Sequence, residues 1–134
     1  MSKNIFDYIE ENLFDETKQT ALGFAEFLCS SNIEFIKDNV HAGMTLLEIR
    51  KFCEKKMMEL GRKLIQDELR MIDKLILDNR DSNLFKPKDF QPTTIKSRLG
   101  EIPIARRRYK MVINGTTKYV YLLDELLEIN EYGE

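Results

Sequence analysis

The spacing of apolar residues changes once along this chain, between Asn79 and Thr93. Before Asn79, apolar residues recur every three or four positions, which is typical of one face of an α-helix. After Thr93, apolar and polar residues alternate, as they do along a β-strand with one buried face. A chain of 134 residues suffices for one domain and rarely for two. The sequence therefore predicts a single α+β domain over residues 1–134.

The helical two thirds, residues 1–79, is predicted to hold about three helices, one of them long. Residues 4–15 and 17–39 both have amphipathic spacing, and the second segment is apolar on so broad a face that we expect it to lie centrally. Thr45, with a glutamate three residues later, matches the capping box that begins many helices. From this cap one long helix is predicted over residues 44–79.

The β part begins after a predicted connecting loop, residues 80–92, which contains two prolines. Residues 93–122 are predicted to form a three-stranded antiparallel meander with strands over 93–98, 101–113 and 116–122. Leu99-Gly100 predicts a tight turn, and Asn114-Gly115 predicts a type I′ hairpin because both residues tolerate positive φ. A short helix is predicted over residues 123–131, where acidic residues stand early, as a helix N-terminus prefers.

The hairpin fixes which residues share a face of the sheet. If Asn114-Gly115 forms a two-residue loop, Lys110 opposes Tyr119 and Arg108 opposes Tyr121, and opposed residues lie on the same face. One face is then basic and aromatic, with Arg106, Arg108, Lys110, Tyr119 and Tyr121. The other face is the expected core face, with Ala105, Tyr109, Met111, Ile113, Val120 and Leu122.

The charge of the chain is unevenly distributed. The net charge is −2, yet residues 92–122 carry seven basic side chains against one acidic side chain. Such a basic block suits a polyanion, and the functional interpretation is a face that contacts phosphates and bases. The predicted contacts are Arg106, Arg108 and Lys110, with Arg98, Lys96 and Lys118 at the rim and Tyr119 and Tyr121 packing arginine stems or stacking on bases. Alternatively, these cations pair with acidic side chains of the same protein.

No group of residues predicts catalysis. The six glycines form no phosphate-binding loop, and Cys29 and Cys53 lack the spacing of zinc ligands, so we predict no metal ion, no cofactor and no small-molecule substrate. Both cysteines lie in helical patterns and are expected to be buried free thiols. With no apolar segment long enough for a membrane and an acidic start without a signal peptide, the sequence predicts a cytoplasmic protein.

The stretch from Leu60 to Ile129 reads LGRKLIQDELRMIDKLILDNR, then TTIKSRLGEIPIARRRY, then YVYLLDELLEI. In this order it resembles the N-terminal region of the ISLre-two type insertion-sequence transposases of bacteria, a family long regarded as uncharacterised. The matching positions are Gly61, Arg62, Asp73, Thr94, Gly100, Glu101, Arg107, Tyr109 and residues 121–127, with Glu128 where the family usually has glycine.

The resemblance implies a protein of transposition that handles DNA. Family members are several times longer, and the resemblance places their metal-dependent acidic catalytic residues downstream of this block. We therefore expect a domain that is not an enzyme and that binds DNA. The alternative is an interaction module, in which the 44–79 helix pairs two copies or the basic sheet docks an acidic partner such as the catalytic domain.

Overall fold

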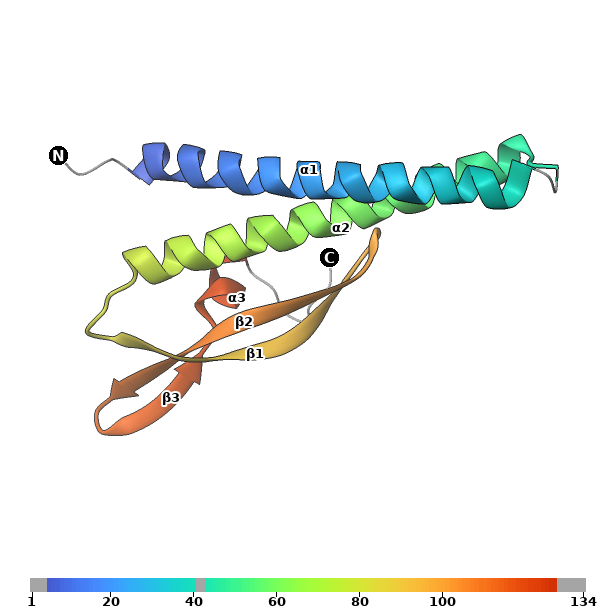
Figure 1. The fold of residues 1–134 in the computed structure, drawn as a ribbon. Coiled ribbons are helices and arrows are strands. Elements are labelled where there is room, and N and C mark those ends of the chain that lie inside the picture. Colours follow the sequence, from blue (N-terminus) through green and yellow to red (C-terminus); the bar gives the residue numbers. More distant parts are fainter. Residues whose placement is uncertain (1–4, 41–42, 128–134) are drawn as a thin grey trace. The chain divides into compact units, whose positions relative to one another are not determined.

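The computed structural model describes residues 5–40 and 43–127 of the chain (Figure 1). It confirms the predicted α+β class, with helices in the first part followed by a three-stranded antiparallel sheet and a short helix. The chain divides into two compact units, a helical unit up to Asp67 and a sheet unit from Glu68. The elements are α1 (Ile5–Asn39), α2 (Leu46–Asn79), β1 (Phe85–Ser97), β2 (Gly100–Ile113), β3 (Thr116–Val120) and α3 (Leu122–Leu127).

The helical unit is an antiparallel hairpin of α1 and the part of α2 up to Asp67. The ring of Phe35 stacks on that of Phe52 with centroids 4.3 Å apart. Farther from the connection, the hydroxyl of Thr20 donates a hydrogen bond to the carboxylate of Asp67. The contact partners on α2 thus have higher residue numbers where those on α1 have lower ones, so the two helices are antiparallel.

The helices of this unit correct one prediction and confirm another. The predicted division between residues 4–15 and 17–39 is wrong, because α1 is one helix of 35 residues and has no proline or glycine before Gly23 to interrupt it. The expected central position of α1 is also wrong among the described residues, since most of its side chains are exposed. The predicted cap at Thr45 is confirmed, because its hydroxyl oxygen accepts a hydrogen bond from the amide of Glu48 at 3.2 Å.

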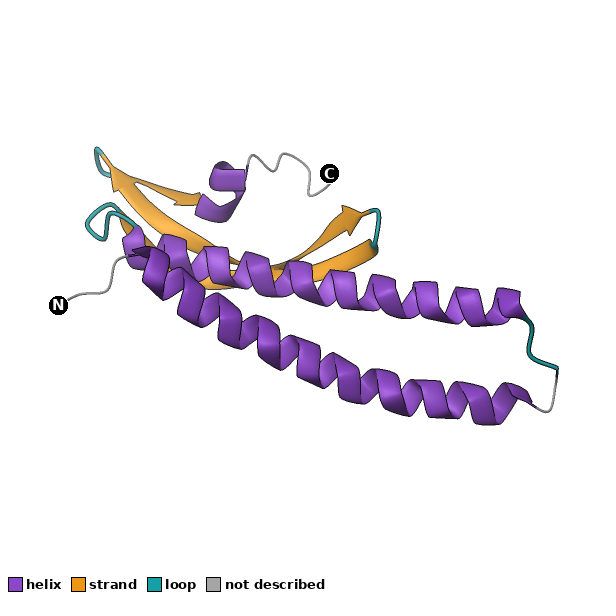
Figure 2. Ribbon diagram, turned by 90° about the horizontal axis from the view of Figure 1, so that it is seen from above, coloured by secondary structure: helices purple, strands orange, loops and turns teal. Residues whose placement is uncertain are grey.

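The sheet has the strand order β1-β2-β3, and its strands are drawn in orange in Figure 2. The predicted loop over residues 80–92 is too long, because β1 begins at Phe85 and includes Pro87 and Pro92. Proline is tolerated in β1 because this is an edge strand, and its register with β2 shifts between Pro87 and Asp89. The connection from α2 therefore shortens to residues 80–84.

The two turns of the meander differ in how well they were predicted. The Asn114-Gly115 hairpin is confirmed, with φ of 51° and 77° at these residues. The first turn falls on Arg98-Leu99, one residue earlier than predicted, and Gly100 with φ 112° is the first residue of β2. β3 ends at Val120 because α3 begins at Leu122, so the predicted pairing of Arg108 with Tyr121 lies beyond the ladder.

The buried face of β2 changes along the strand. Ile102 and Tyr109 are both fully buried, and because they are an odd number of residues apart they lie on opposite faces. Tyr109 and Val120 are confirmed as core residues, and Met111 is half-buried. The predicted core positions Ala105 and Ile113 are wrong, since the change of face leaves Ala105 exposed and Ile113 lies beside the exposed hairpin turn.

The short C-terminal helix begins one residue earlier than predicted. α3 covers Leu122–Leu127, and residues 128–131 of the predicted helix lie outside the described residues. Because α3 begins directly after the sheet, strand alternation no longer decides burial there, and Leu123 is buried where Leu122 was expected.

Candidate nucleic-acid interface

The three consecutive arginines of β2 each pair with an aspartate from a different element of the sheet unit. Neighbouring side chains of a strand point to opposite faces, so Arg107 lies on the face opposite to Arg106 and Arg108. The pairs are Arg106–Asp124 at 2.7 Å, Arg107–Asp73 at 3.1 Å and Arg108–Asp89 at 2.6 Å. For these three arginines, the alternative expectation that the cations pair with acidic side chains of the same protein is therefore the correct one.

Arg108 and Asp89 form a two-pronged ion pair between adjacent strands. Nε and Nη2 of Arg108 donate hydrogen bonds of 2.9 and 2.6 Å to the two carboxylate oxygens of Asp89. These hydrogen bonds lower the pKa of Asp89 and raise the pKa of Arg108. The guanidinium carbon of Arg108 also lies 4.9 Å from the ring centroid of Tyr119. The pair thus fixes both the charge and the direction of Arg108 on this face.

Arg106 is held between an acid and an aromatic ring. Its Nη1 donates to Asp124 of α3, and its guanidinium carbon lies 3.7 Å from the ring centroid of Tyr121. Arginine stacked on an aromatic face in this way is attracted by the electrons of the ring. Tyr119 and Tyr121 therefore both lie against arginines.

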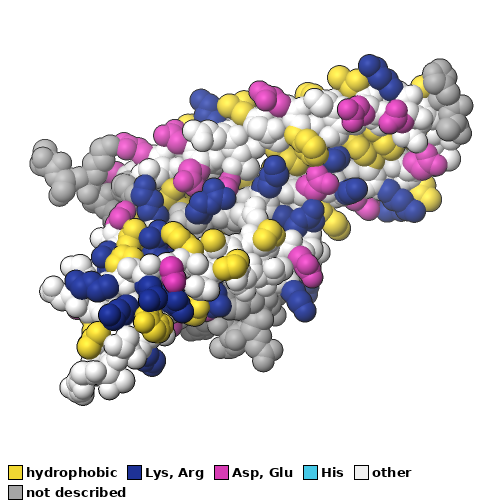
Figure 3. Space-filling model, turned by 60° about the horizontal axis from the view of Figure 1, so that its bottom comes forward, with side chains coloured by type: hydrophobic (Ala, Val, Ile, Leu, Met, Phe, Trp, Pro, Cys, Tyr) yellow, Lys and Arg dark blue, Asp and Glu magenta, His cyan; other side chains and the backbone are white. Residues whose placement is uncertain are grey.

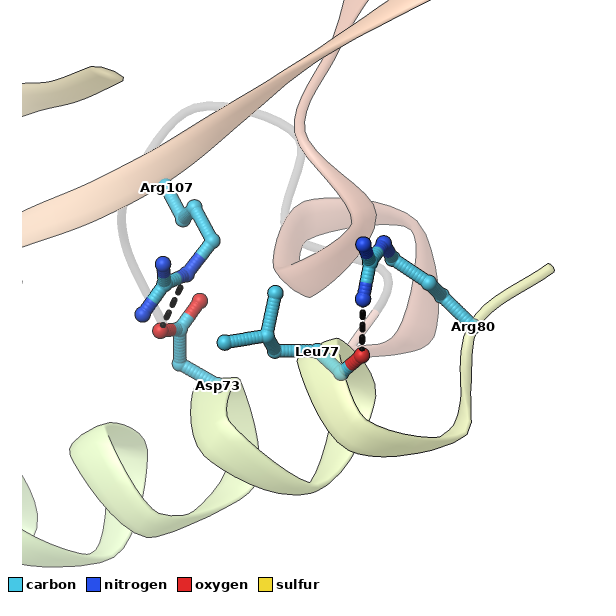
Figure 4. Close-up of polar contacts among 4 residues, drawn as sticks. All are labelled: Asp73, Leu77, Arg80 and Arg107. Carbon is cyan, nitrogen blue, oxygen red and sulfur yellow. Dashed lines mark hydrogen bonds and ion pairs between the residues drawn. The ribbon is translucent and has the colours of Figure 1, made fainter. Parts of the chain in front are cut away.

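On the other face of the sheet, Arg107 pairs with Asp73, which belongs to the last turns of α2 (Figure 4). Asp73 is only 8% exposed, and this burial raises its pKa, while the hydrogen bond from Arg107 acts in the other direction. The guanidinium carbon of Arg107 lies 4.5 Å from the ring centroid of Phe90. Figure 4 also shows Arg80 bonded to the carbonyl oxygen of Leu77, which closes the end of α2.

Three exposed lysines lie on the face of Arg106 and Arg108, and two of them, Lys88 and Lys110, are neighbours of Tyr119. The register places Lys86 directly opposite Lys110, and Lys110 directly opposite Tyr119. Lys88 lies at the irregularity of β1, with its Nζ 5.0 Å from the Tyr119 ring centroid. We call Lys86, Lys88 and Lys110 the lysine cluster. Figure 3 shows basic side chains gathered over the sheet.

Sequence reasoning found Lys110 but missed Lys86 and Lys88. Both precede Thr93 in the segment predicted as a loop, and the two prolines concealed the strand. The available signal was the alternation Lys86-Pro87-Lys88, which has strand spacing once proline is accepted at a sheet edge.

The predicted rim residues lie apart from the lysine cluster. Lys96 and Arg98 are at the turn between β1 and β2, where Lys96 opposes Glu101. Lys118 opposes Met111, which places it on the face opposite to Lys110. The structure therefore brings together Arg106, Arg108, Lys110, Tyr119 and Tyr121, but not the three rim residues.

Within residues 5–40 and 43–127, no three His, Cys, Asp or Glu side chains converge to hold a metal ion. Nor is any helix in this described part long and apolar enough to cross a membrane. Cys29 of α1 and Cys53 of α2 are both exposed, so the prediction of buried thiols is wrong.

Residues 39–133 match the Uncharacterised protein family (UPF0236), and the chain belongs to this family. The match covers all of α2 and the sheet unit nearly to its end, and it leaves out almost all of α1. It confirms that the chain belongs to an uncharacterised family, the coarser part of the predicted relationship. Comparisons with curated proteins and with solved structures found no match.

Proposed function

We propose that this chain is a non-catalytic, DNA-binding domain of a transposase-like protein. The observation that carries the proposal is the lysine cluster, in which Lys86 and Lys110 stand opposite each other on the exposed face of the sheet. Like charges directly opposite on a sheet destabilise it. The ammonium group of Lys86 donates a hydrogen bond to the carbonyl oxygen of Ser82, a neutral group that leaves its charge uncompensated. An anion bound beside the lysine cluster reduces the repulsion between its like charges, and a DNA backbone supplies a row of such anions.

The surrounding residues favour a role for the cluster in binding a backbone rather than in reading bases. Arg108 is neutralised by Asp89 and supports the ring of Tyr119, against which Lys88 is also held. We therefore assign the phosphate contacts mainly to the lysines, and we assign Arg106 and Arg108 to holding Tyr121 and Tyr119 in place. Such contacts attract phosphates without distinguishing sequences.

The transposase-like context of the proposal comes from the resemblance of residues 60–129. Three positions of that motif, Asp73, Arg107 and Tyr109, lie close together in the sheet unit, and Asp73 and Tyr109 are buried. Their burial supports a role of the motif in folding the domain that presents the lysine cluster. The catalytic step of transposition would then belong to another part of the longer protein.

The test is fluorescence anisotropy of the chain with labelled duplex DNA at about 50 mM and about 200 mM salt. Neutralising three phosphates predicts a log–log salt slope of about −2.7 from the cluster alone. A variant with Lys86, Lys88 and Lys110 changed to alanine is expected to bind more weakly to every duplex and to lose that part of the slope.

The matched control changes Lys51, Lys55 and Lys63 to alanine, because these lysines are exposed on α2 and remove the same charge from the helical unit. It is expected to bind DNA nearly as the wild type does. Equal loss in both variants would show that only net charge matters. Unchanged binding by the cluster variant, or no binding at about 50 mM salt, would overturn the proposal.

A further inference from the structure

The helical unit exposes far more apolar side chains than it buries. Among its described residues, Phe24 of α1 is the only large apolar side chain that is buried. On the contact side of α1, Thr20 and Phe35 reach Asp67 and Phe52 of α2. A helix that is apolar around most of its circumference is normally covered on more than one side. The hairpin alone covers only one side of α1.

A second apolar stripe follows the uncovered side of α1. Its members recur at steps of three or four residues, the spacing at which side chains share one side of a helix. Leu22, Cys29 and Ile36 are seven residues apart, as in helices that pack in bundles. The α1 stripe consists of Leu22, Ala25, Cys29, Ile33 and Ile36, continued just past the helix by Val40, and all six are exposed.

A matching stripe lies on α2 within the helical unit. Leu46 and Met57 are 80% and 69% exposed, which are large fractions for apolar side chains. They belong to the α2 stripe, which consists of Leu46, Ile49, Cys53 and Met57. The two stripes of one chain lie on helices that are already joined by the Phe35–Phe52 contact, so each stripe needs a helix from elsewhere.

The charges of the two helices indicate which helix covers which stripe. α1 carries eight acidic and two basic side chains. The part of α2 from Leu46 to Asp67 carries four acidic and six basic side chains. Two α1 helices packed together would bring like charges together, whereas α1 against α2 brings opposite charges together. A second copy of this chain supplies both helices at once.

We infer that a second copy of the chain packs on the helical unit, with each α1 stripe against the α2 stripe of the other copy. A twofold arrangement makes both contacts equally and gives a four-helix assembly. The inference concerns the helical unit alone and does not depend on DNA binding by the lysine cluster. Figure 3 shows apolar side chains that reach the surface along this hairpin.

The test is sedimentation velocity of the full chain over a wide range of protein concentration. The expected mass at high concentration is twice the 15.8 kDa of one chain. Ile33→Glu places a charge in the α1 stripe and is expected to give single chains where the wild type is a dimer. Val112→Glu in the sheet is the matched control, because Val112 and Ile33 are both 53% exposed.

The cysteines give a second measurement that needs no variant. Cys29 and Cys53 are exposed in one chain, and each lies in one of the two stripes. Their rate of reaction with a thiol reagent is therefore expected to fall as the wild-type protein is concentrated. A single-chain mass at every concentration, thiol rates independent of concentration, or equal dissociation by Val112→Glu and Ile33→Glu would each overturn the inference.

Discussion

Arg107 of β2 donates a hydrogen bond from Nε to the Oδ2 of Asp73 on α2, across 3.1 Å. Asp73 is nearly buried, and the ring of Phe90 lies against the guanidinium group of Arg107. This ion pair joins the last turns of α2 to the middle of the sheet unit (Figure 4). Because the two residues are 34 positions apart in sequence, the contact fixes the tertiary structure of the unit and not a single element.

Replacing Asp73 tests the strength of this connection. Asp73→Ala removes the carboxylate that accepts the hydrogen bond from Arg107 and leaves this donor unpaired in a partly desolvated place, which is expected to lower the free energy of unfolding by about 2–3 kcal/mol. Urea unfolding followed by circular dichroism measures the change. Glu68→Ala, on an exposed position of α2, is the control and is expected to stay close to the wild type. A loss no larger than that of the control would contradict a structural role of the pair.

Asp73 and Asp89 are expected to titrate on opposite sides of the ordinary aspartate pKa of 3.8. Burial raises the pKa of Asp73, whereas hydrogen bonds from Arg108 lower the pKa of Asp89. Carboxyl carbon NMR measures both midpoints in one pH titration of the folded protein. A midpoint of Asp73 at or below that of Asp89 would show that burial does not dominate at Asp73.

The two shifts change stability in opposite directions as the pH falls. The native state protonates Asp73 before the unfolded chain does, so this residue makes its full favourable contribution below pH 3.8 and loses it as pH rises through the raised pKa. The contribution of Asp89 is complete above pH 3.8 and is lost as pH falls through the lowered pKa. Asp89→Asn is therefore expected to remove stability at neutral pH and none in strong acid.

Tyr109 offers a prediction of the opposite kind, in which removing a polar group does no harm. Its side chain is fully buried, and its hydroxyl has no hydrogen-bond partner among the described residues. Tyr109→Phe is therefore expected to leave the free energy of unfolding unchanged or to raise it by up to about 1 kcal/mol. Tyr119→Phe, on an exposed ring, is the control. A marked loss of stability for Tyr109→Phe alone would mean that the hydroxyl has a partner.

Local signals in the sequence predicted the parts of the fold that depend on neighbouring residues. Asn114-Gly115 predicted a hairpin with a two-residue loop, because both residues adopt positive φ readily. The pairing of Lys110 with Tyr119 followed from this loop length. The cap at Thr45 was predictable because a threonine followed three residues later by a glutamate is also a local signal. The start of β1 was not, because its prolines are local breaking signals that pairing with β2 overrides at an edge.

The candidate site was predictable in part, and the missing part is non-local. Alternation along the strands placed Arg106 and Arg108 on one face, but it could not show which acids meet them. Those acids come from three different elements: Asp73 from α2, Asp89 from β1 and Asp124 from α3. Helical spacing likewise predicted apolar faces for Cys29 and Cys53 without showing whether anything in the same chain covers them.

The lysine cluster predicts a conflict between stability and binding that one substitution can reveal. Lys110→Glu replaces the like-charge pair with Lys86 by an opposite-charge pair across the strands. The free energy of unfolding is expected to rise by about 0.5 kcal/mol at low salt, and the gain is expected to shrink as salt screens the exposed pair. Urea unfolding at two salt concentrations measures this gain, and Lys118→Glu, opposite Met111, is the control with the same change of charge.

The same Lys110→Glu protein is expected to bind duplex DNA more weakly than the wild type, although it is more stable. This combination distinguishes a binding role from a folding role. A lysine that only stabilised the fold would not lie opposite another lysine, because the like charges repel each other. If Lys110→Glu lowers the free energy of unfolding, or if Lys118→Glu raises it as much, then repulsion between Lys86 and Lys110 does not destabilise the sheet. The reason for expecting an anion beside the lysine cluster would then be lost.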